Sequence, residues 1–133
     1  MPYLYVRIAG DADPVLAERV AADLLAITGS VLGKRKEVTS ISIDFVPATT
    51  WFVGGSRVAD DAPSTFYLNI KITEGTNTKD QKAAYVDKVF PAMQALIGPL
   101  ARASYIVIDD VRADAWGFEG KTQEQRYITA RTL

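Results

Sequence analysis

The chain has 133 residues, of which 48% are hydrophobic, and this is enough to bury one core but not two independent ones. Its 15 basic and 16 acidic residues leave a net charge of −1, which offers no overall field to attract nucleic acid or an anionic membrane. The sequence has no cysteine and no histidine, which excludes disulfides, thiol nucleophiles, the commonest metal ligand and the usual catalytic base.

The first half of the chain predicts a strand, a helix and a returning strand. Residues 3–8 (YLYVRI) alternate between two kinds of side chain, which is the period of a strand whose faces meet different surroundings. Asp13 can cap a helix whose first position is Pro14, and Gly33 ends the apolar repeat of that helix. Residues 40–44 (SISID) then form the returning strand.

The second half predicts the same order of elements. The paired glycines at 54–55 suit a tight hairpin or turn, which is followed by a linker over residues 57–64. Residues 67–72 (YLNIKI) alternate like the first strand, and residues 78–81 (TKDQ) have the capping-box pattern that opens a helix. This helix contains Pro91, which we expect to kink it or to split it into two pieces.

An internal repeat relates the two halves. SISID at 40–44 and WFVGG at 51–55 recur as YIVID at 105–109 and WGFEG at 116–120, so 65 residues separate equivalent positions without a gap. The first strand recurs at 67–72 with an offset of 64 residues. The shared tryptophan and glycine positions favour a duplicated unit over a chance likeness between two amphipathic segments.

The repeat predicts an α+β fold. Each strand-helix-strand unit makes a right-handed crossover between parallel strands, and two tandem β-α-β units give a four-stranded mixed sheet with both helices on one face. We expect a single domain, residues 1–133, made of pseudo-repeats 2–58 and 65–122 with a C-terminal tail at 123–133. Each half must complete the core of the other.

The second face of this sheet predicts an oligomer. It carries Tyr3, Tyr5 and Tyr67, together with Ile41 and Ile43 or their alternates. We expect such a face to be too apolar to remain in water, so other subunits should cover it.

Three further patterns exclude other classes of protein. No apolar run reaches the roughly 18 residues of a membrane span, and the N-terminus does not resemble a signal peptide, so we expect a cytoplasmic protein. Asp109 and Asp110 are adjacent strand residues that point to opposite faces, so they do not converge on a metal ion. Gly54-Gly55 has no Lys-Ser or Lys-Thr after it and is not a phosphate-binding loop.

Pro2 is the candidate catalytic residue. If Met1 is removed, Pro2 carries a free secondary amine, which would give a chain without histidine a base for neutral pH. An ordinary α-amino group titrates at about 7.7–8.0, and burial among apolar side chains lowers that value. A base tuned in this way suits general acid–base catalysis. Taken alone, Pro2 fits the start of an edge strand better than a catalytic role, because its missing N–H costs nothing there and position two tolerates many residues.

These features resemble the tautomerase superfamily, whose members include 4-oxalocrotonate tautomerase, macrophage migration inhibitory factor, malonate semialdehyde decarboxylase and the chloroacrylic acid dehalogenases. The resemblance covers essentially the whole chain, through Pro2, the duplicated unit, ITEG at 72–75 and WFVGG at 51–55. The segment ADAWGF at 113–118 looks like a Trp-Ser-Phe-Gly region of the decarboxylase branch. The resemblance implies a homotrimer with Pro2 at the mouth of a pocket between subunits, acting as general base or, protonated, as general acid.

The resemblance also implies substrate-binding residues. Lys34 matches the substrate-binding lysine of the cytokine branch, and Tyr105 matches its active-site tyrosine. Arg35 can offer a fork to a carboxylate, and Trp116 lies in the decarboxylase-like segment. The basic run that contains Lys34 and Arg35 equally fits a solvated helix end, while aromatic residues such as Tyr105, Trp51 and Trp116 are more often found in a core or interface than in a pocket wall.

One departure from the family limits its chemistry. Members that act on dicarboxylates usually carry an arginine in a stretch resembling Glu-Gly-Arg, where this chain has Glu74-Gly75-Thr76, and its first-half counterpart also lacks one. The dehalogenases and the decarboxylase likewise need arginines near Thr73 and Thr76 to hold a carboxylate. Arg35, or Arg7 from a neighbouring subunit, could substitute.

The predicted function is keto–enol proton transfer on a small carbonyl compound, with Pro2 as the base and with no cofactor or metal. Lys34 and Tyr105 or backbone N–H groups would hold the enolate. One alternative is a hydratase, dehalogenase or decarboxylase in which protonated Pro2 acts as an acid on an unsaturated or β-keto acid. Another is a non-catalytic binding or signalling trimer, which retention of Met1 would favour because the peptide bond abolishes the basicity of Pro2.

Overall fold

The structure is a computed structural model that describes residues 1–61 and 63–131. Its elements in chain order are β1 (Tyr3–Ala9), α1 (Pro14–Leu32), η1 (Lys36–Val38), β2 (Ser40–Val46), β3 (Phe52–Val53), β4 (Ser56–Arg57), α2 (Val58–Asp61), β5 (Phe66–Thr73), α3 (Lys79–Ile97), β6 (Tyr105–Val111), η2 (Ala113–Ala115), β7 (Gly117–Phe118), β8 (Lys121–Thr122) and α4 (Gln123–Arg131). Among the described helices, none is long and apolar enough to cross a membrane.

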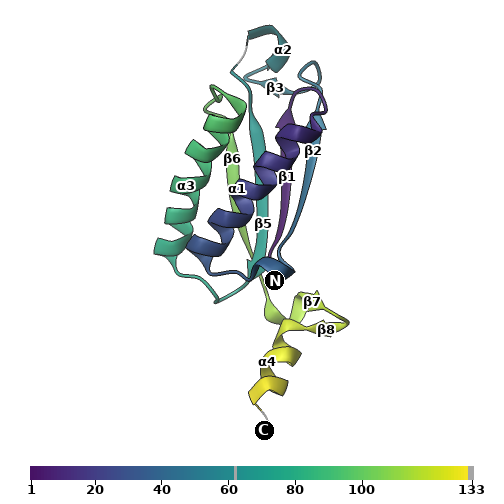
Figure 1. Ribbon diagram of the computed structural model, residues 1–133, viewed down its shortest axis with the longest axis vertical. Coiled ribbons are helices and arrows are strands. Elements are labelled where there is room, and N and C mark those ends of the chain that lie inside the picture. Colours follow the sequence, from purple (N-terminus) through teal and green to yellow (C-terminus); the bar gives the residue numbers. More distant parts are fainter. Residues whose placement is uncertain (62, 132–133) are drawn as a thin grey trace.

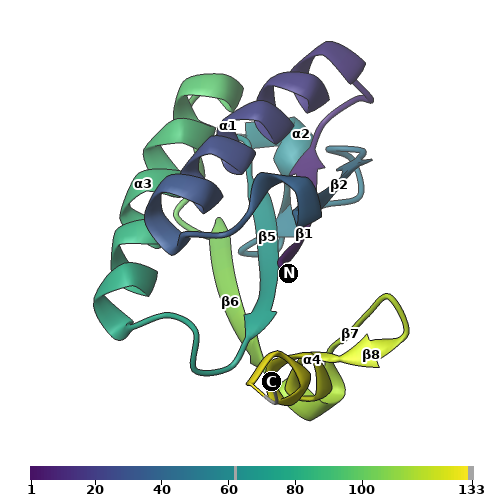
Figure 2. The same ribbon diagram turned by 60° about the horizontal axis from the view of Figure 1, so that its bottom comes forward.

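A four-stranded sheet in the order β2-β1-β5-β6 forms the centre of the molecule. Strands β1 and β2 run parallel, as do β5 and β6, while β1 and β5 pair antiparallel. Both long helices, α1 and α3, cover the same face (Figures 1 and 2). The predicted mixed sheet of two β-α-β units is therefore confirmed. Its central antiparallel pair places the start of β1 beside the end of β5, with Tyr3 opposite Lys71.

The core lies between the sheet and the two helices. Strand alternation sends every second side chain of β1 and β5 toward α1 and α3, where burial of apolar surface stabilises the fold. The fully buried members are Leu4, Val6, Ile8, Val20, Leu24, Phe66, Leu68, Ile70, Ile72, Tyr85, Val89 and Met93. Both halves contribute to this one cluster, so neither unit has a core of its own.

The helix ends follow the sequence signals. Asp13 caps α1 through a 3.0 Å hydrogen bond that its carboxylate accepts from the amide of Leu16. Gly33 ends α1 in the left-handed conformation, with φ 68°, which glycine adopts at little cost. Thr78 and Gln81 form the predicted reciprocal capping box at the start of α3.

Helix α3 continues through Pro91 as one element, so the expected split into two pieces is wrong. Proline removes one helical hydrogen bond, to the carbonyl group of Asp87 four residues earlier. Pro91 lies on the exposed side of the helix, where water can bind that carbonyl group. The opposite side remains anchored by the buried Val89 and Met93.

A short hairpin and helix follow the last strand of each unit. In the first unit, Gly54 and Gly55 have positive φ (59° and 85°) and close the predicted hairpin between β3 and β4. Helix α2 occupies part of what the sequence predicted as a linker. In the second unit, hairpin β7–β8 is followed by α4, and this arm projects from the sheet in Figures 1 and 2.

The face of the sheet opposite the helices is more polar than its tyrosines suggested. Ile41 and Ile43 pack on the helix side, and their alternates on the open face are Ser42 and Asp44. Charged and amide side chains accompany Tyr3, Tyr5 and Tyr67 there, namely Arg7, Asn69, Lys71 and Asp109. This face is therefore mixed in character, with aromatic rings between hydrogen-bonding groups.

Candidate active site

Pro2 lies at one end of the sheet, directly before β1, and is buried. Its carbonyl oxygen accepts a 3.2 Å hydrogen bond from the amide of Ser40, which ties the N-terminus to the start of β2. The strand directions bring the starts of β1 and β2 together with the ends of β5 and β6 at this end. The segments that follow α1, β5 and β6 therefore surround Pro2.

Lys34 and Arg35 bring positive charge to this end of the sheet. They follow the left-handed Gly33 that ends α1, and this turn directs the chain toward the start of β2. The pKa of the Met1 amino group lies below its usual value, first because of burial and then because of the nearby charges of Lys34 and Arg35. Two of the predicted substrate-binding residues therefore act electrostatically on the N-terminus.

Lys34 is held in place by a residue from the other unit. Its ammonium group donates a 2.9 Å hydrogen bond to Oγ1 of Thr76, in the turn after β5. Burial lowers the pKa of Lys34, while the carboxylate of Asp110 acts in the opposite direction. Thr76 occupies the position at which the sequence lacks an arginine, and Lys34, which follows α1, places a positive charge beside it.

Arg35 is far less constrained than Lys34. Within the described residues its only ion pair is with Glu37 at 3.7 Å, and both side chains are more than 70% exposed. Surface pairs of this kind contribute little to stability. The guanidinium can therefore turn toward a ligand at small energetic cost.

Trp116 reaches the N-terminus from the arm that follows β6. Its indole Nε1–H donates a 2.8 Å hydrogen bond to the carbonyl oxygen of Met1, the group bonded directly to the Pro2 nitrogen. The indole is half-buried. The structure thus joins Trp116 to Pro2 across 114 positions of the chain, which the repeat alone did not predict.

The adjacent carboxylates of Asp109 and Asp110, in β6, have separate partners. Asp109 accepts a hydrogen bond from Lys71 on the open face, and Asp110 accepts one from Lys82 of α3 on the helix side, both at 2.6 Å. The prediction that they point apart is confirmed. Within the described part of the chain, acidic side chains form no cluster that could hold a metal ion.

Tyr105 is the predicted site residue that a single protomer does not bring to Pro2. It begins β6, opposite Tyr67, and its ring is 58% exposed. The end of β6 that approaches Pro2 is Val111, six residues further along, or about 20 Å at the rise of a strand. Tyr105 therefore reaches a Pro2 site only if it belongs to a neighbouring subunit.

Known proteins are similar to this chain in two ways, one over the second unit and one over nearly the whole chain. A family model described as tautomerase enzyme matches residues 67–126, which cover the second unit. The chain superposes on the crystal structure of native fused 4-OT with a TM-score of 0.82 and 22% identity, over 92% of this chain and 97% of that one. No curated protein matches the chain.

Two further solved structures share the fold over nearly the whole chain. A fused 4-OT wild type symmetric trimer has a TM-score of 0.80 and 18% identity, over 92% of this chain and 96% of that one. Pt0534 inactivated by 2-oxo-3-pentynoate has a TM-score of 0.82 and 10% identity, over 93% and 98%. The second unit therefore matches the tautomerase family model, and the whole chain has the fold of the fused 4-OT structures, with two units joined in one chain.

Proposed function

We propose that this protein is an enzyme that uses the imino nitrogen of Pro2, freed by removal of Met1, as a base for keto–enol proton transfer on a small carbonyl compound. The observation that carries the proposal is the surroundings of the N-terminus. A buried strand start is flanked by Lys34 and Arg35, and the N–H of Trp116 points at the carbonyl group next to the Pro2 nitrogen.

The electrostatics of this end favour a neutral amine. Burial, Lys34 and Arg35 all lower the pKa of the amino group that Met1 carries there. After loss of Met1, the Pro2 nitrogen would lie one residue deeper among the same groups, so its pKa should fall in the same direction. A neutral secondary amine can accept a proton from the carbon beside a carbonyl group and return it elsewhere.

Trp116 supplies a candidate donor for the developing enolate. The Met1 carbonyl oxygen stands in for a substrate carbonyl oxygen, because it lies beside the Pro2 nitrogen and accepts the indole N–H at 2.8 Å. Removal of Met1 would leave this donor free to bind a substrate. A preorganised N–H directed at developing negative charge stabilises the transition state more than the ground state.

The two cations favour substrates that carry a carboxylate, such as 2-oxo acids. Lys34 is held near the site by Thr76, and Arg35 is free to form a paired hydrogen bond with a carboxylate. An all-apolar wall would instead have favoured neutral aryl or alkyl enols. Among the structural relatives, Pt0534 is inactivated by 2-oxo-3-pentynoate, which is itself a 2-oxo acid.

The alternative chemistry needs the opposite protonation state. A hydratase, dehalogenase or decarboxylase of this type would use protonated Pro2 as an acid. The neighbouring cations and burial lower the proton affinity of the N-terminus, and they therefore favour the base. Because Arg35 can bind a carboxylate, unsaturated acids and β-keto acids should be tested as substrates together with the enols.

We further propose that the protein works as a cytoplasmic homotrimer in which a neighbouring subunit brings Tyr105 to Pro2. A fused 4-OT of the same fold is a symmetric trimer. The exposed Tyr105 and the projecting α4 arm are surfaces that neighbouring copies can cover. We expect pseudo-repeats 2–58 and 65–122 to contribute different walls of each shared site.

The direct test is the Pro2→Ala variant, assayed for ketonisation of the enol of a small aryl 2-oxo acid. We expect activity to fall by about 10²- to 10⁴-fold, the usual contribution of a positioned general base. Pro14→Ala, which changes an exposed proline at the start of α1, is the matched control and should keep its activity. A fully active Pro2→Ala protein would rule the mechanism out.

A mass measurement separates the enzymatic reading from the non-catalytic one. Protein made in its native host should lack Met1, and 2-oxo-3-pentynoate should add one covalent mass to the peptide that begins with Pro2. Complete retention of Met1 would favour a binding or signalling trimer. An adduct on another residue would show that the reactive nucleophile lies elsewhere.

A further inference from the structure

Each unit of the repeat places a cation beside an aspartate on the open face of the sheet. In the second unit, Lys71 of β5 and Asp109 of β6 are register partners, and their side chains form an ion pair at 2.6 Å. In the first unit, Arg7 of β1 and Asp44 of β2 are register partners in the same way. The second unit therefore shows that a cation and an aspartate at these register positions can form an ion pair.

The first unit does not make the equivalent pair. Asp44 instead accepts a 2.9 Å hydrogen bond from the hydroxyl group of Tyr5. In the second unit the position of Tyr5 is held by Asn69, at the offset of 64 residues, and Asp109 remains with Lys71. Within residues 1–61 and 63–131, no described carboxylate lies within ion-pair distance of Arg7. The hydrogen bond from Tyr5 thus engages Asp44, and the guanidinium of Arg7 has no carboxylate partner among the described residues.

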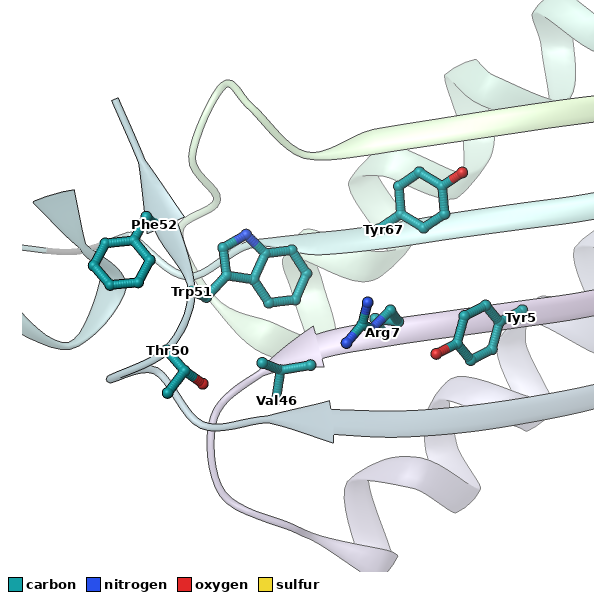
Figure 3. A pocket seen from close by; sticks show the side chains of 7 residues that line it. All are labelled: Tyr5, Arg7, Val46, Thr50, Trp51, Phe52 and Tyr67. Carbon is teal, nitrogen blue, oxygen red and sulfur yellow. The ribbon is translucent and has the colours of Figure 1, made fainter. Parts of the chain in front are cut away.

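The unpaired guanidinium lies in a cavity of about 530 Å³. The walls come from strands β1, β2, β3 and β5 and from the loop before β3, and they are mainly aromatic: Tyr5, Val46, Thr50, Trp51, Phe52 and Tyr67. Figure 3 shows Arg7 between the side chains of Tyr5 and Trp51, with Tyr67 alongside on β5. This volume falls in the range of small-molecule pockets, which combine apolar walls with a few polar groups.

The cavity is separate from the Pro2 site of the same protomer. Arg7 lies five residues along β1 from Pro2, or about 17 Å at the rise of an antiparallel strand. None of the groups that surround Pro2 lines this cavity, and its tryptophan is Trp51, the repeat partner of Trp116. The duplicated unit has therefore kept an aromatic pocket at its second end without a proline to act as base.

We propose that this cavity is a second ligand site, which binds a small aromatic carboxylate through Arg7. A guanidinium forms paired, charge-assisted hydrogen bonds with a carboxylate, and the rings of Tyr5, Trp51 and Tyr67 offer flat apolar surface to the body of the ligand. We expect this site to bind its ligand without catalysing a reaction, because no titratable base stands at the position that corresponds to Pro2 in the other unit.

The two tryptophans allow each site to be read separately. Trp116→Phe leaves Trp51 as the only tryptophan, and Trp51→Phe leaves Trp116. In the purified assembly, benzoate should change the fluorescence of Trp51 in the first variant with a saturating dependence on concentration. Benzamide has the same ring but no charge, so it cannot form the charge-assisted pair with Arg7. It should therefore bind at least about tenfold more weakly, which corresponds to about 1.4 kcal/mol. Addition of Pro2→Ala should leave the response of Trp51 unchanged.

Arg7→Gln in the Trp116→Phe background should weaken benzoate binding by about tenfold or more, as expected for loss of a charge-assisted hydrogen bond. Lys71→Gln is the matched control, since this cation on the same face is already paired with Asp109, and it should leave the affinity unchanged. Tyr5→Phe keeps the ring but frees Asp44 to pair with Arg7, so it should also weaken binding.

Three results would overturn the proposal. The first is a Trp51 signal that benzoate does not change, or changes equally in the Arg7→Gln variant. The second is a benzoate response confined to Trp116, which would place the ligand at Pro2. The third is an assembly that falls apart in Arg7→Gln while the wild type binds no benzoate, which would assign Arg7 to a contact between subunits.

Discussion

At the scale of single residues, one buried hydroxyl pair links the two units through their helices. Oγ1 of Thr28 on α1 and the phenol of Tyr85 on α3 lie 2.8 Å apart in the core. Burial raises the pKa of Tyr85 to about 12, although the hydrogen bond with Thr28 acts against the shift. The folded protein therefore holds the phenol proton more tightly than the unfolded chain does.

This shift predicts a loss of stability at high pH. Below pH 10, the ordinary value, Tyr85 is protonated in both states, so its contribution is complete. Between about pH 10 and 12 the unfolded chain releases this proton first, and the free energy of unfolding should fall by at most about 3 kcal/mol. Urea titrations across this range test it, with Tyr85→Phe as the control. An equal fall in the variant would show that other groups cause it.

Lys34 should control both substrate binding and the basicity of Pro2. Its charge lowers the pKa of the N-terminal amine, so Lys34→Gln should raise that pKa and move the acid limb of the pH–rate profile to higher pH. The KM for a carboxylated substrate should also rise by about tenfold. Lys36→Gln, from the same basic run but exposed, is the matched control. An unmoved profile in Lys34→Gln would contradict the electrostatic account.

At the residue scale, the sequence predicted the end of α1 at Gly33 correctly, because that signal is local. The turn at Gly33 delivers Lys34 and Arg35 to the start of β2, so their proximity to the N-terminus follows from the helix end. The contacts of Trp116 with Met1 and of Lys34 with Thr76 join segments far apart in the chain. A local sequence pattern cannot predict such contacts, because they arise from the antiparallel pairing of the two units.

At the scale of elements, the capping box of α3 should be worth a measurable part of its stability. The hydroxyl group of Thr78 accepts the amide of Gln81 at 3.1 Å, and the Gln81 side chain accepts the amide of Thr78 at 2.9 Å. Thr78→Ala should lower the free energy of unfolding by about 1 kcal/mol, while Thr78→Ser should retain most of it. Denaturant titration of both variants measures the difference. Equal stabilities would show that the cap contributes nothing.

Most elements were predictable because their signals are periodic or lie at helix ends. The four strands of the central sheet, both long helices and the first glycine hairpin appear where the sequence placed them. Helices α2 and α4, the hairpin β7–β8 and the unbroken α3 were not predicted. A single turn of helix has too few residues to show a period, and the effect of Pro91 depends on which side of the helix faces water.

At the scale of the whole molecule, we expect the catalytic site to be shared between subunits. A protomer leaves Tyr105 about a strand's length from its own Pro2. Tyr105→Ala and Pro2→Ala homo-oligomers should both have low activity. Mixed assemblies should regain activity, because some sites then combine an intact Pro2 with an intact Tyr105 from the neighbour. Failure of unfolded and co-refolded mixtures to exceed the parent variants would contradict a shared site.

The central claim is that the nitrogen of Pro2 is a free amine with lowered proton affinity. Titration of the protein labelled with ¹⁵N-proline, followed by NMR, measures that atom directly. The account predicts a titrating N-terminal imino signal with a pKa below the ordinary α-amino value of about 7.7–8.0. A Pro2 nitrogen that remains in a peptide bond with Met1, or one that titrates at or above that value, would contradict it.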